Sequence, residues 1–321
     1  MGFGIKDFLR WFPDFRRLEK RNARLLAQIA EVESEREKER VRHTEWARFF
    51  PPGHFYSPLP SAEEIAEAHA RGGFGPPFPA IDLNAAGQFA RLEKFATYYA
   101  EQPFPEQPTA GRRFHLNNPS YGHYDAIMLY GMLREARPQR IIEVGSGFSS
   151  AAMLDLNETV LGGSAHFTFI DPDMTRLRPL LRVEDHTRCA LIEQRVQDVP
   201  LETFMALREN DVLFIDSSHV SKIGSDVNRL FFQVLPALAP GVLIHIHDVS
   251  GNLEYPREWL DAGRAWNEQY LLRAFLMNNS AYRIELFTGW LFNLRHAWLS
   301  QHMPLGARGG GGQIWLRKLT A

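Results

Sequence analysis

Two short polar clusters carry the side chains best suited to acid–base or metal chemistry. Asp216 and His219 lie three residues apart after one apolar run, and His247 and Asp248 end the next such run. Two carboxylates can hold Mg²⁺ together with a substrate hydroxyl, and a histidine can accept the proton that the hydroxyl releases. We therefore expect Asp216, His219 and His247 to be catalytic, with Asp216 and Asp248 as metal ligands.

A glycine-rich stretch, residues 143–150, precedes both clusters in the chain. Gly145 and Gly147 permit positive φ angles and a close approach of a ligand to the backbone, and the start of a helix favours anionic groups. A dinucleotide fingerprint would need a third glycine where Ser150 stands. The stretch therefore predicts a cofactor site but disfavours a nicotinamide dinucleotide as its ligand.

The elements that must position these residues alternate between short apolar strands and helices. This alternation indicates an α/β fold with a parallel, doubly wound sheet that is covered on both faces. Ligands of such sheets bind beyond the carboxyl ends of the strands, where the motif residues are expected. The strands are expected at 140–144, 166–170, 190–192, 211–215, 241–246, 282–287 and 313–318, and the helices among them at 124–136, 149–160, 201–207, 221–238 and 265–277, with a plain connection through Trp298.

In this order of motifs the chain resembles the class I adenosylmethionine-dependent methyltransferases, over roughly residues 113–318. The resemblance implies a Rossmann-like sheet that ends in antiparallel strands. It implies that Glu143 faces the ammonium group of adenosylmethionine and that Asp171 binds the ribose hydroxyls. Gln197 and Asp198 would lie beside the adenine ring. The implied cofactor residues are Glu143, Gly145, Ser146, Gly147, Ser149 (where the family more commonly has a third glycine), Asp171, Gln197 and Asp198.

The two polar clusters resemble a subgroup of this family, the O-methyltransferases of sugars and natural products. Asp216, His219 and Asp248 match the subgroup's pattern, but His247 stands where the subgroup has an acid. Nitrogen is a poorer Mg²⁺ ligand than carboxylate oxygen. Two mechanisms therefore remain open, one with Mg²⁺ and one without metal in which His219 or His247 is the base. His245 is expected to be a satisfied histidine within its strand.

Other functions remain open on the residues alone. A NAD-dependent oxidoreductase could use the same Rossmann scaffold, although Ser150 and the lack of a Tyr-x-x-x-Lys pair disfavour it. A non-catalytic scaffold protein could retain the fold, although the polar edge disfavours that function. Asp171 also has a second interpretation, because with Pro172 it suits the start of a helix.

The chain is expected to divide into three parts. Residues 1–45 should form a helical segment, because 18–42 contains neither glycine nor proline. Residues 46–112 are rich in proline and aromatic side chains, and we expect them to form a strap or lid. Residues 113–321 should form the adenosylmethionine-binding domain. Residues 84–99 and 61–71 are expected to be helical within the strap, the latter with a capping box.

The N-terminal helix carries a weak apolar repeat. Leu18, Leu25 and Val32 recur every seven residues and Ile29 lies between them. This pattern predicts a homo-oligomer formed through a short coiled coil, or a solvated single helix, since so short a repeat favours neither strongly.

Composition narrows the class of protein. A formal net charge of −2 over 321 residues gives no overall basic footprint for a nucleic-acid backbone, so we expect no nucleic-acid partner. The resemblance implies a small-molecule or glycan substrate instead. Cys189 is the single cysteine, which excludes an intrachain disulfide and fits a reducing compartment. No apolar run approaches the roughly 20 residues that span a bilayer. We therefore expect a cytoplasmic protein without a transmembrane segment.

Overall fold

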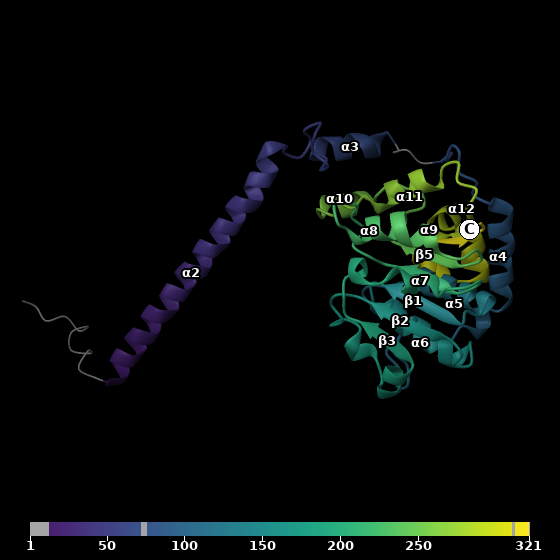
Figure 1. The fold of residues 1–321 in the computed structure, drawn as a ribbon, viewed down its shortest axis with the longest axis horizontal. Coiled ribbons are helices and arrows are strands. Elements are labelled where there is room, and N and C mark those ends of the chain that lie inside the picture. The colour runs from purple at the N-terminus through teal and green to yellow at the C-terminus, as the bar shows by residue number, and fades with distance from the viewer. Residues whose placement is uncertain (1–12, 72–75, 310–311, 321) are drawn as a thin grey trace, which may run out of the picture. The chain divides into compact units, whose positions relative to one another are not determined.

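The computed structural model describes residues 13–71, 76–309 and 312–320, which fall into two compact units (Figure 1). One unit ends at Ala70 and the other begins at Arg71. The first contains the long helix α2 (Pro13–Phe49), drawn in purple, and the short helix α3 (Ala62–Ala70). The second contains the whole sheet. Within the described residues, no helix has the length and apolar composition needed to cross a membrane.

Helix α2 confirms the helix expected over residues 18–42 and extends beyond it at both ends. It contains no glycine, and its one proline occupies the first position, where the missing N–H costs no hydrogen bond. Its apolar stripe is exposed, because Leu18, Leu25, Ile29 and Val32 keep 57%, 47%, 53% and 54% of their surface accessible. Residues 1–12 of the expected N-terminal segment lie outside the described residues.

The segment expected as a strap is shared between the two units. Helix α3 belongs to the first, and its capping box is confirmed by mutual hydrogen bonds between Ser61 and Glu64. Helix α4 (Ala85–Thr97) belongs to the second, where the Gln88 side chain accepts a hydrogen bond from the backbone N–H of Phe287 at 2.6 Å. Helix α4 is therefore held against the edge of the sheet.

A seven-stranded sheet forms the centre of the second unit, in the order β3-β2-β1-β4-β5-β7-β6. The first five strands are parallel, and β7 is antiparallel to both of its neighbours. This topology confirms the expected Rossmann-like α/β sheet with antiparallel terminal strands. The strands are β1 (Arg140–Val144), β2 (His166–Ile170), β3 (Cys189–Ile192), β4 (Val212–Ile215), β5 (Leu243–His247), β6 (Tyr282–Phe287) and β7 (Gln313–Lys318).

Helices connect the strands where expected, with two differences. The region between β6 and β7 is not a plain connection but folds into helix α12 (Thr288–His302). The helix expected over 221–238 begins only at Asp226, because Ser225 is its N-cap and accepts the backbone N–H of Asn228 with its side chain. The other helical segments of this unit are η1 (Tyr99–Glu101), α5 (His123–Ala136), α6 (Phe148–Thr159), η2 (Arg178–Leu180), η3 (Val183–Thr187), η4 (Val196–Asp198), α7 (Leu201–Met205), α8 (Asp226–Arg229), the π-helical η5 (Leu230–Val234), α9 (Leu235–Ala237), α10 (Arg257–Asp261), α11 (Glu268–Leu276) and η6 (Gly306–Arg308).

Alternate residues of the strands enter two separate cores. In β4, Val212 and Phe214 pack in one core with residues of α5 and α6. Leu213 and Ile215 pack in the other with residues of α8, α9 and α11. Side chains of a strand point alternately to opposite faces, so burial on both faces explains why the strands read as continuous apolar runs.

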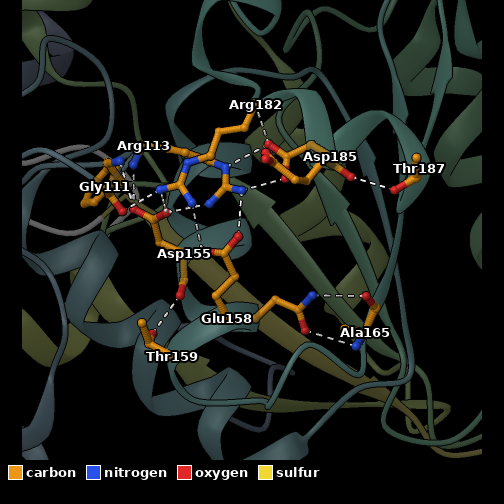
Figure 2. A network of polar contacts seen from close by, with 12 residues as sticks. Gly111, Arg113, Asp155, Glu158, Thr159, Ala165, Arg182, Asp185 and Thr187 are labelled. Carbon is orange, nitrogen blue, oxygen red and sulfur yellow. Dashed lines mark hydrogen bonds and ion pairs between the residues drawn. The ribbon is translucent and has the colours of Figure 1, made fainter.

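A buried ion-pair network anchors the segment that precedes α5 and the first strand (Figure 2). The Arg113 guanidinium donates to Asp155 at 2.9 Å, to Glu158 at 2.7 Å and to Asp185 at 2.5 Å. Its backbone N–H also donates to Asp155. Since Asp155 and Glu158 lie in α6 and Asp185 lies in η3, one side chain ties three segments together.

Candidate active site

The carboxyl ends of the strands border a cavity of about 1060 Å³. It is lined from both halves of the parallel sheet, by the turn after β1 and by the ends of β2, β4 and β5. No described residue of 76–112 belongs to this lining, so the sheet-bound part of the strap does not contribute to it. The predicted residues that line the cavity are Gly145, Ser146, Gly147, Ser149, Asp171, Gln197, Asp216, His219, His247 and Asp248.

Glu143 is not part of the cavity wall. It is fully buried beneath the turn, where its carboxylate accepts hydrogen bonds from the hydroxyls of Ser149, at 2.5 Å, and Ser150. Burial raises the pKa of Glu143 to about 8, although the two serines lower it. The structure therefore differs from the expected direct contact with a ligand, because the first turn of α6 covers the carboxylate.

The two glycines of the turn have different structural roles. Gly145 has a φ of 85°, and a Cβ built on it would lie 1.7 Å from the carbonyl oxygen of Asp216. A side chain is therefore excluded by the neighbouring strand end, not by a ligand. At Gly147 a Cβ would meet only the side chain of Arg176, at 2.8 Å, so this glycine borders the cavity itself.

Asp171 lies at the end of β2 on the cavity wall. Its carboxylate accepts hydrogen bonds from the backbone N–H groups of Ser146 and Asp173, both at 2.8 Å. The hydroxyl of Ser146 is buried beside it and has no hydrogen-bond partner among the described residues. A buried hydroxyl without a partner is unusual, so the Ser146 hydroxyl marks the start of this turn as a candidate ligand contact.

The polar pair after β3 separates in the structure. Gln197 lines the cavity and donates to the carbonyl oxygen of Gly224 at 2.8 Å. Asp198 instead pairs with Arg195 at 2.9 Å and lies outside the lining. The two residues therefore do not border one cavity, since Gln197 lies in its lining and Asp198 is engaged at the surface.

The ends of β4 and β5 bring Asp216, His219 and Asp248 together. His219 Nε2 lies 3.4 Å from Asp216 Oδ1 and 3.3 Å from Asp248 Oδ2. One ligand atom of each residue lies within 4.8 Å of the others, a spacing that suits a metal ion. His219 and Asp248 have φ values of 59° and 56°, a conformation that is rare for non-glycine residues and is typical of functional turns.

The buried residue Glu268 holds His219 in place, a partner that the sequence patterns did not identify. Glu268 Oε2 lies 2.8 Å from His219 Nδ1, and the carbonyl oxygen of His219 accepts the backbone N–H groups of Asn267 and Glu268. The start of α11 therefore orients the imidazole from behind and directs Nε2 into the cavity. An acid in the first turn of a helix is common, so it gave no distinct signal.

His247 adjoins the same carboxylates from the other side. Its Nδ1 lies 3.5 Å from Asp248 and 3.7 Å from Asp216, and its Nε2 lies 3.8 Å from Asp125. The ring of Tyr121 stacks against it with a centroid distance of 5.3 Å. His247 thus has nearby charges but no hydrogen bond among the described residues, in contrast to His219.

His245 corrects one expectation about this strand. Its ring is fully buried and stacks on Phe214 at 3.7 Å, but neither ring nitrogen has a hydrogen-bond partner among the described residues. Burial lowers the pKa of His245 well below its usual range. It is therefore a neutral core residue, not a satisfied one.

The charges of the site are strongly coupled. Burial lowers the pKa of His219, but its bonds to Asp216 and Glu268 outweigh burial and raise the pKa to about 10. Burial also lowers the pKa of His247, and the charge of Asp216 outweighs it and raises the pKa well above its usual range. The surrounding carboxylates therefore favour the protonated form of both imidazoles.

Comparisons with known proteins agree with this architecture. Residues 142–249 match a family model described as a methyltransferase domain. An uncharacterised protein of Archaeoglobus fulgidus is 34% identical over 174 residues, which cover 52% of this chain and 77% of that protein.

Solved structures with similar folds include methyltransferases with low sequence identity. Podospora anserina methyltransferase PaMTH1, bound to adenosylhomocysteine, is 14% identical and has a TM-score of 0.41, with 81% of this chain and 97% of that chain covered. The O-methyltransferase TomG of Streptomyces achromogenes is 16% identical, with a TM-score of 0.39 and coverage of 72% and 90%. Likenesses at this level do not bear on the reaction.

Proposed function

The chain belongs to the class I adenosylmethionine-dependent methyltransferases, and from this premise we propose that it methylates a hydroxyl oxygen of a sugar or another small natural product. The observation that carries this proposal is the orientation of His219, which Glu268 holds at Nδ1 while Nε2 points to Asp216 and Asp248. Transfer to a hydroxyl needs a base that removes its proton and otherwise needs mainly alignment. Neither a nicotinamide oxidoreductase nor a non-catalytic scaffold finds support in the comparisons.

The residues of the turn fit adenosylmethionine. Ser146, whose buried hydroxyl has no hydrogen-bond partner among the described residues, and Asp171 line the same cavity, where they could bind the ribose hydroxyls of that cofactor. Gly147 leaves the cavity floor open to the methionine part. Glu143 supports this site through Ser149 and Ser150 instead of contacting the ligand. When bound, the cofactor supplies an electrophilic methyl group on a sulfonium.

His219 is the proposed base. Its Nδ1–H is fixed by Glu268, so Nε2 is the atom that accepts a proton from the acceptor hydroxyl. A base must be neutral, yet Asp216 and Asp248 favour the protonated form. Neutralisation of these carboxylates by a cation would lower the pKa of His219 toward its usual range. His247 is the second candidate base, and it lacks such a fixed orientation.

Asp216 and Asp248 are the proposed ligands of a divalent cation, with His219 within reach of the same point. Mg²⁺ prefers oxygen ligands, which favours the two carboxylates over either imidazole. A cation held there would acidify a coordinated hydroxyl and would replace the positive charge that the protonated histidines now provide. Metal and protons therefore compete for this site.

The proposal is tested first by cofactor binding and then by turnover. Calorimetric titration should show binding of adenosylhomocysteine and no binding of NAD. Methyl release from adenosylmethionine is then measured against a panel of hydroxylated sugars and phenols. We expect His219→Ala to keep its affinity for adenosylhomocysteine and to lose turnover by about 10²–10⁴-fold.

Matched variants distinguish the two candidate bases, and chelation tests whether the reaction needs a metal. His186→Ala, at an exposed histidine, should retain full turnover. If His247→Ala loses most of its turnover and His219→Ala loses little, the base is His247. Loss of activity in EDTA with recovery in Mg²⁺ supports the metal site, and full activity in EDTA leaves a histidine mechanism. Full activity of both histidine variants would show that this edge of the sheet is not catalytic.

A further inference from the structure

One wall of the cavity consists of Trp259, Arg264 and Trp266, which the mechanism above does not use. The two indole rings meet edge to face with a centroid distance of 5.2 Å. The Arg264 guanidinium lies over both of them, 5.1 Å from the ring of Trp259 and 5.0 Å from the ring of Trp266. We call these three residues the tryptophan–arginine wall.

The tryptophan–arginine wall adjoins the proposed base directly. The ring of Trp266 lies 4.3 Å from the ring of His219, and Asn267 and Glu268, which follow it in the chain, hold His219 in position. An acceptor whose hydroxyl reaches His219 Nε2 therefore places the neighbouring part of its skeleton against Trp266. An indole face stacks well on a flat aromatic ring or on the apolar face of a sugar.

The charge of the wall is available to a ligand. Arg264 contacts no carboxylate in the part of the chain that the structure describes, whereas Arg257, on the preceding helix, pairs with Asp261 at 3.2 Å. Lys222 also lines the cavity and forms no ion pair there. The Arg264 guanidinium lies over two indole rings and pairs with no carboxylate of the described residues, so its N–H groups can donate to a carboxylate or a phosphate in bidentate geometry.

None of the aspartates that line the cavity forms an ion pair with Arg264 among the described residues. Asp226 accepts hydrogen bonds from the backbone N–H and the hydroxyl of Ser218, at 2.8 and 2.5 Å. Asp216 and Asp248 face the two imidazoles. The positive charge of the wall is thus separate from the negative charge of the proposed metal site.

On the basis of the methyl-transfer function above, we propose that the acceptor is a ring-bearing anion. Its ring packs on Trp266, its carboxylate or phosphate pairs with Arg264, and its reacting hydroxyl points to His219. Arg264 is then a residue that determines specificity, since a neutral acceptor of the same shape would lack the ion pair.

The test compares probes that share a ring and a hydroxyl and differ in the charge of the group opposite the hydroxyl. Binding of 4-hydroxybenzoate, 4-hydroxyphenyl phosphate and the neutral 4-hydroxybenzamide is measured by ligand-observed NMR titration with adenosylhomocysteine present. The wild-type protein should bind at least one anion about 10- to 100-fold more tightly than the amide. The anion that binds more tightly identifies the carboxylate or the phosphate as the preferred group. Arg264→Gln should abolish the preference, and the matched control Arg257→Gln should retain it.

Three results would overturn the proposal. These are equal affinity of the wild-type protein for all three probes, a preference for anions that survives in Arg264→Gln, and a parallel loss of adenosylhomocysteine affinity in Arg264→Gln. The last would assign Arg264 to the carboxylate of the cofactor. Failure of the wild-type protein to bind adenosylhomocysteine contradicts the proposed function instead, and the preference for anions can still be measured in that case.

Discussion

The carboxyl group of Glu143 contributes to the candidate site through hydrogen bonds and does not line its cavity. It is buried below the glycine turn and accepts hydrogen bonds from two serine hydroxyls in the first turn of α6. Water cannot solvate its charged form there, so burial raises its pKa from 4.5 to about 8.

This shift predicts a loss of stability as the pH rises. Below pH 4.5, Glu143 is protonated in both the folded and the unfolded chain. Between about 4.5 and 8 the unfolded chain releases the proton first, so the free energy of unfolding decreases. Glu143→Gln removes this titration and keeps a polar partner for the serines. Relative to this variant, the wild-type melting temperature should therefore fall by several degrees between pH 5 and pH 8.

A second variant controls for general effects of charge. Glu202 is exposed at the start of α7, and Glu202→Gln should retain the wild-type dependence on pH. If Glu143→Gln follows the wild-type curve as closely as this control does, the carboxyl group of Glu143 is already ionised in the folded protein.

The two glycines in the turn between β1 and α6 differ in what a side chain at their position would contact. Gly145→Ala would place a Cβ against the backbone of β4's end, so we expect a marked loss of stability. Gly147 has an extended φ of 176° and only a flexible side chain as neighbour. Gly147→Ala should therefore melt close to the wild-type temperature but bind adenosylhomocysteine more weakly, because its methyl group narrows the cavity.

Thermal unfolding and calorimetric titration of the same two samples measure both effects. Wild-type stability of Gly145→Ala, or wild-type affinity of a folded Gly147→Ala, would contradict this division of roles. A bulky substitution at Gly145 is a poor test of ligand binding, because it disturbs the packing of two strands first.

The ion pairs of Arg113 link α6 and η3 to the chain that precedes the sheet (Figure 2). Arg113→Met would leave Asp155 and Asp185 buried without their cation. Removal of one partner of a buried pair costs about 3–5 kcal/mol, which urea unfolding should detect. Arg178→Met is the matched control. It breaks a pair with Glu193 whose side chains are 52% and 49% exposed, and we expect it to cost at most about 1 kcal/mol. An equal loss of unfolding free energy in the two variants would show that the buried network stabilises the fold no more than an exposed ion pair does.

At the scale of the whole molecule, helix α2 predicts self-association. It lies in a unit separate from the sheet, and its apolar stripe of Leu18, Leu25, Ile29 and Val32 is exposed. A second copy of the helix would bury this stripe. In sedimentation equilibrium we expect the wild-type chain to be an oligomer and Leu25→Lys/Ile29→Lys to be a monomer.

Ala27→Lys provides the control, because Ala27 lies on the opposite face of α2 and should leave the mass unchanged. A monomeric wild-type chain would assign α2 to solvent, and an oligomeric double variant would place the interface elsewhere.

The sequence by itself determined the sheet and the edge where the site lies. Strands buried on both faces appear as short apolar runs, and parallel strands place their carboxyl ends on one side, so the glycine turn, Asp171, Asp216, His219 and Asp248 could be expected around one cavity. The antiparallel end of the sheet followed from the family resemblance. These features depend on local pattern and on topology.

Only the tertiary structure decided how the site works. Glu268 lies 49 residues beyond His219, and its contact depends on where α11 begins relative to β4. Three other features depend in the same way on packing: the covering of Glu143 by two serines, the contact of Gly145 with the end of β4 and the position of Arg264 over two tryptophans. Residue types and spacing record local preferences, whereas the direction of a side chain is set by segments that are distant in the sequence.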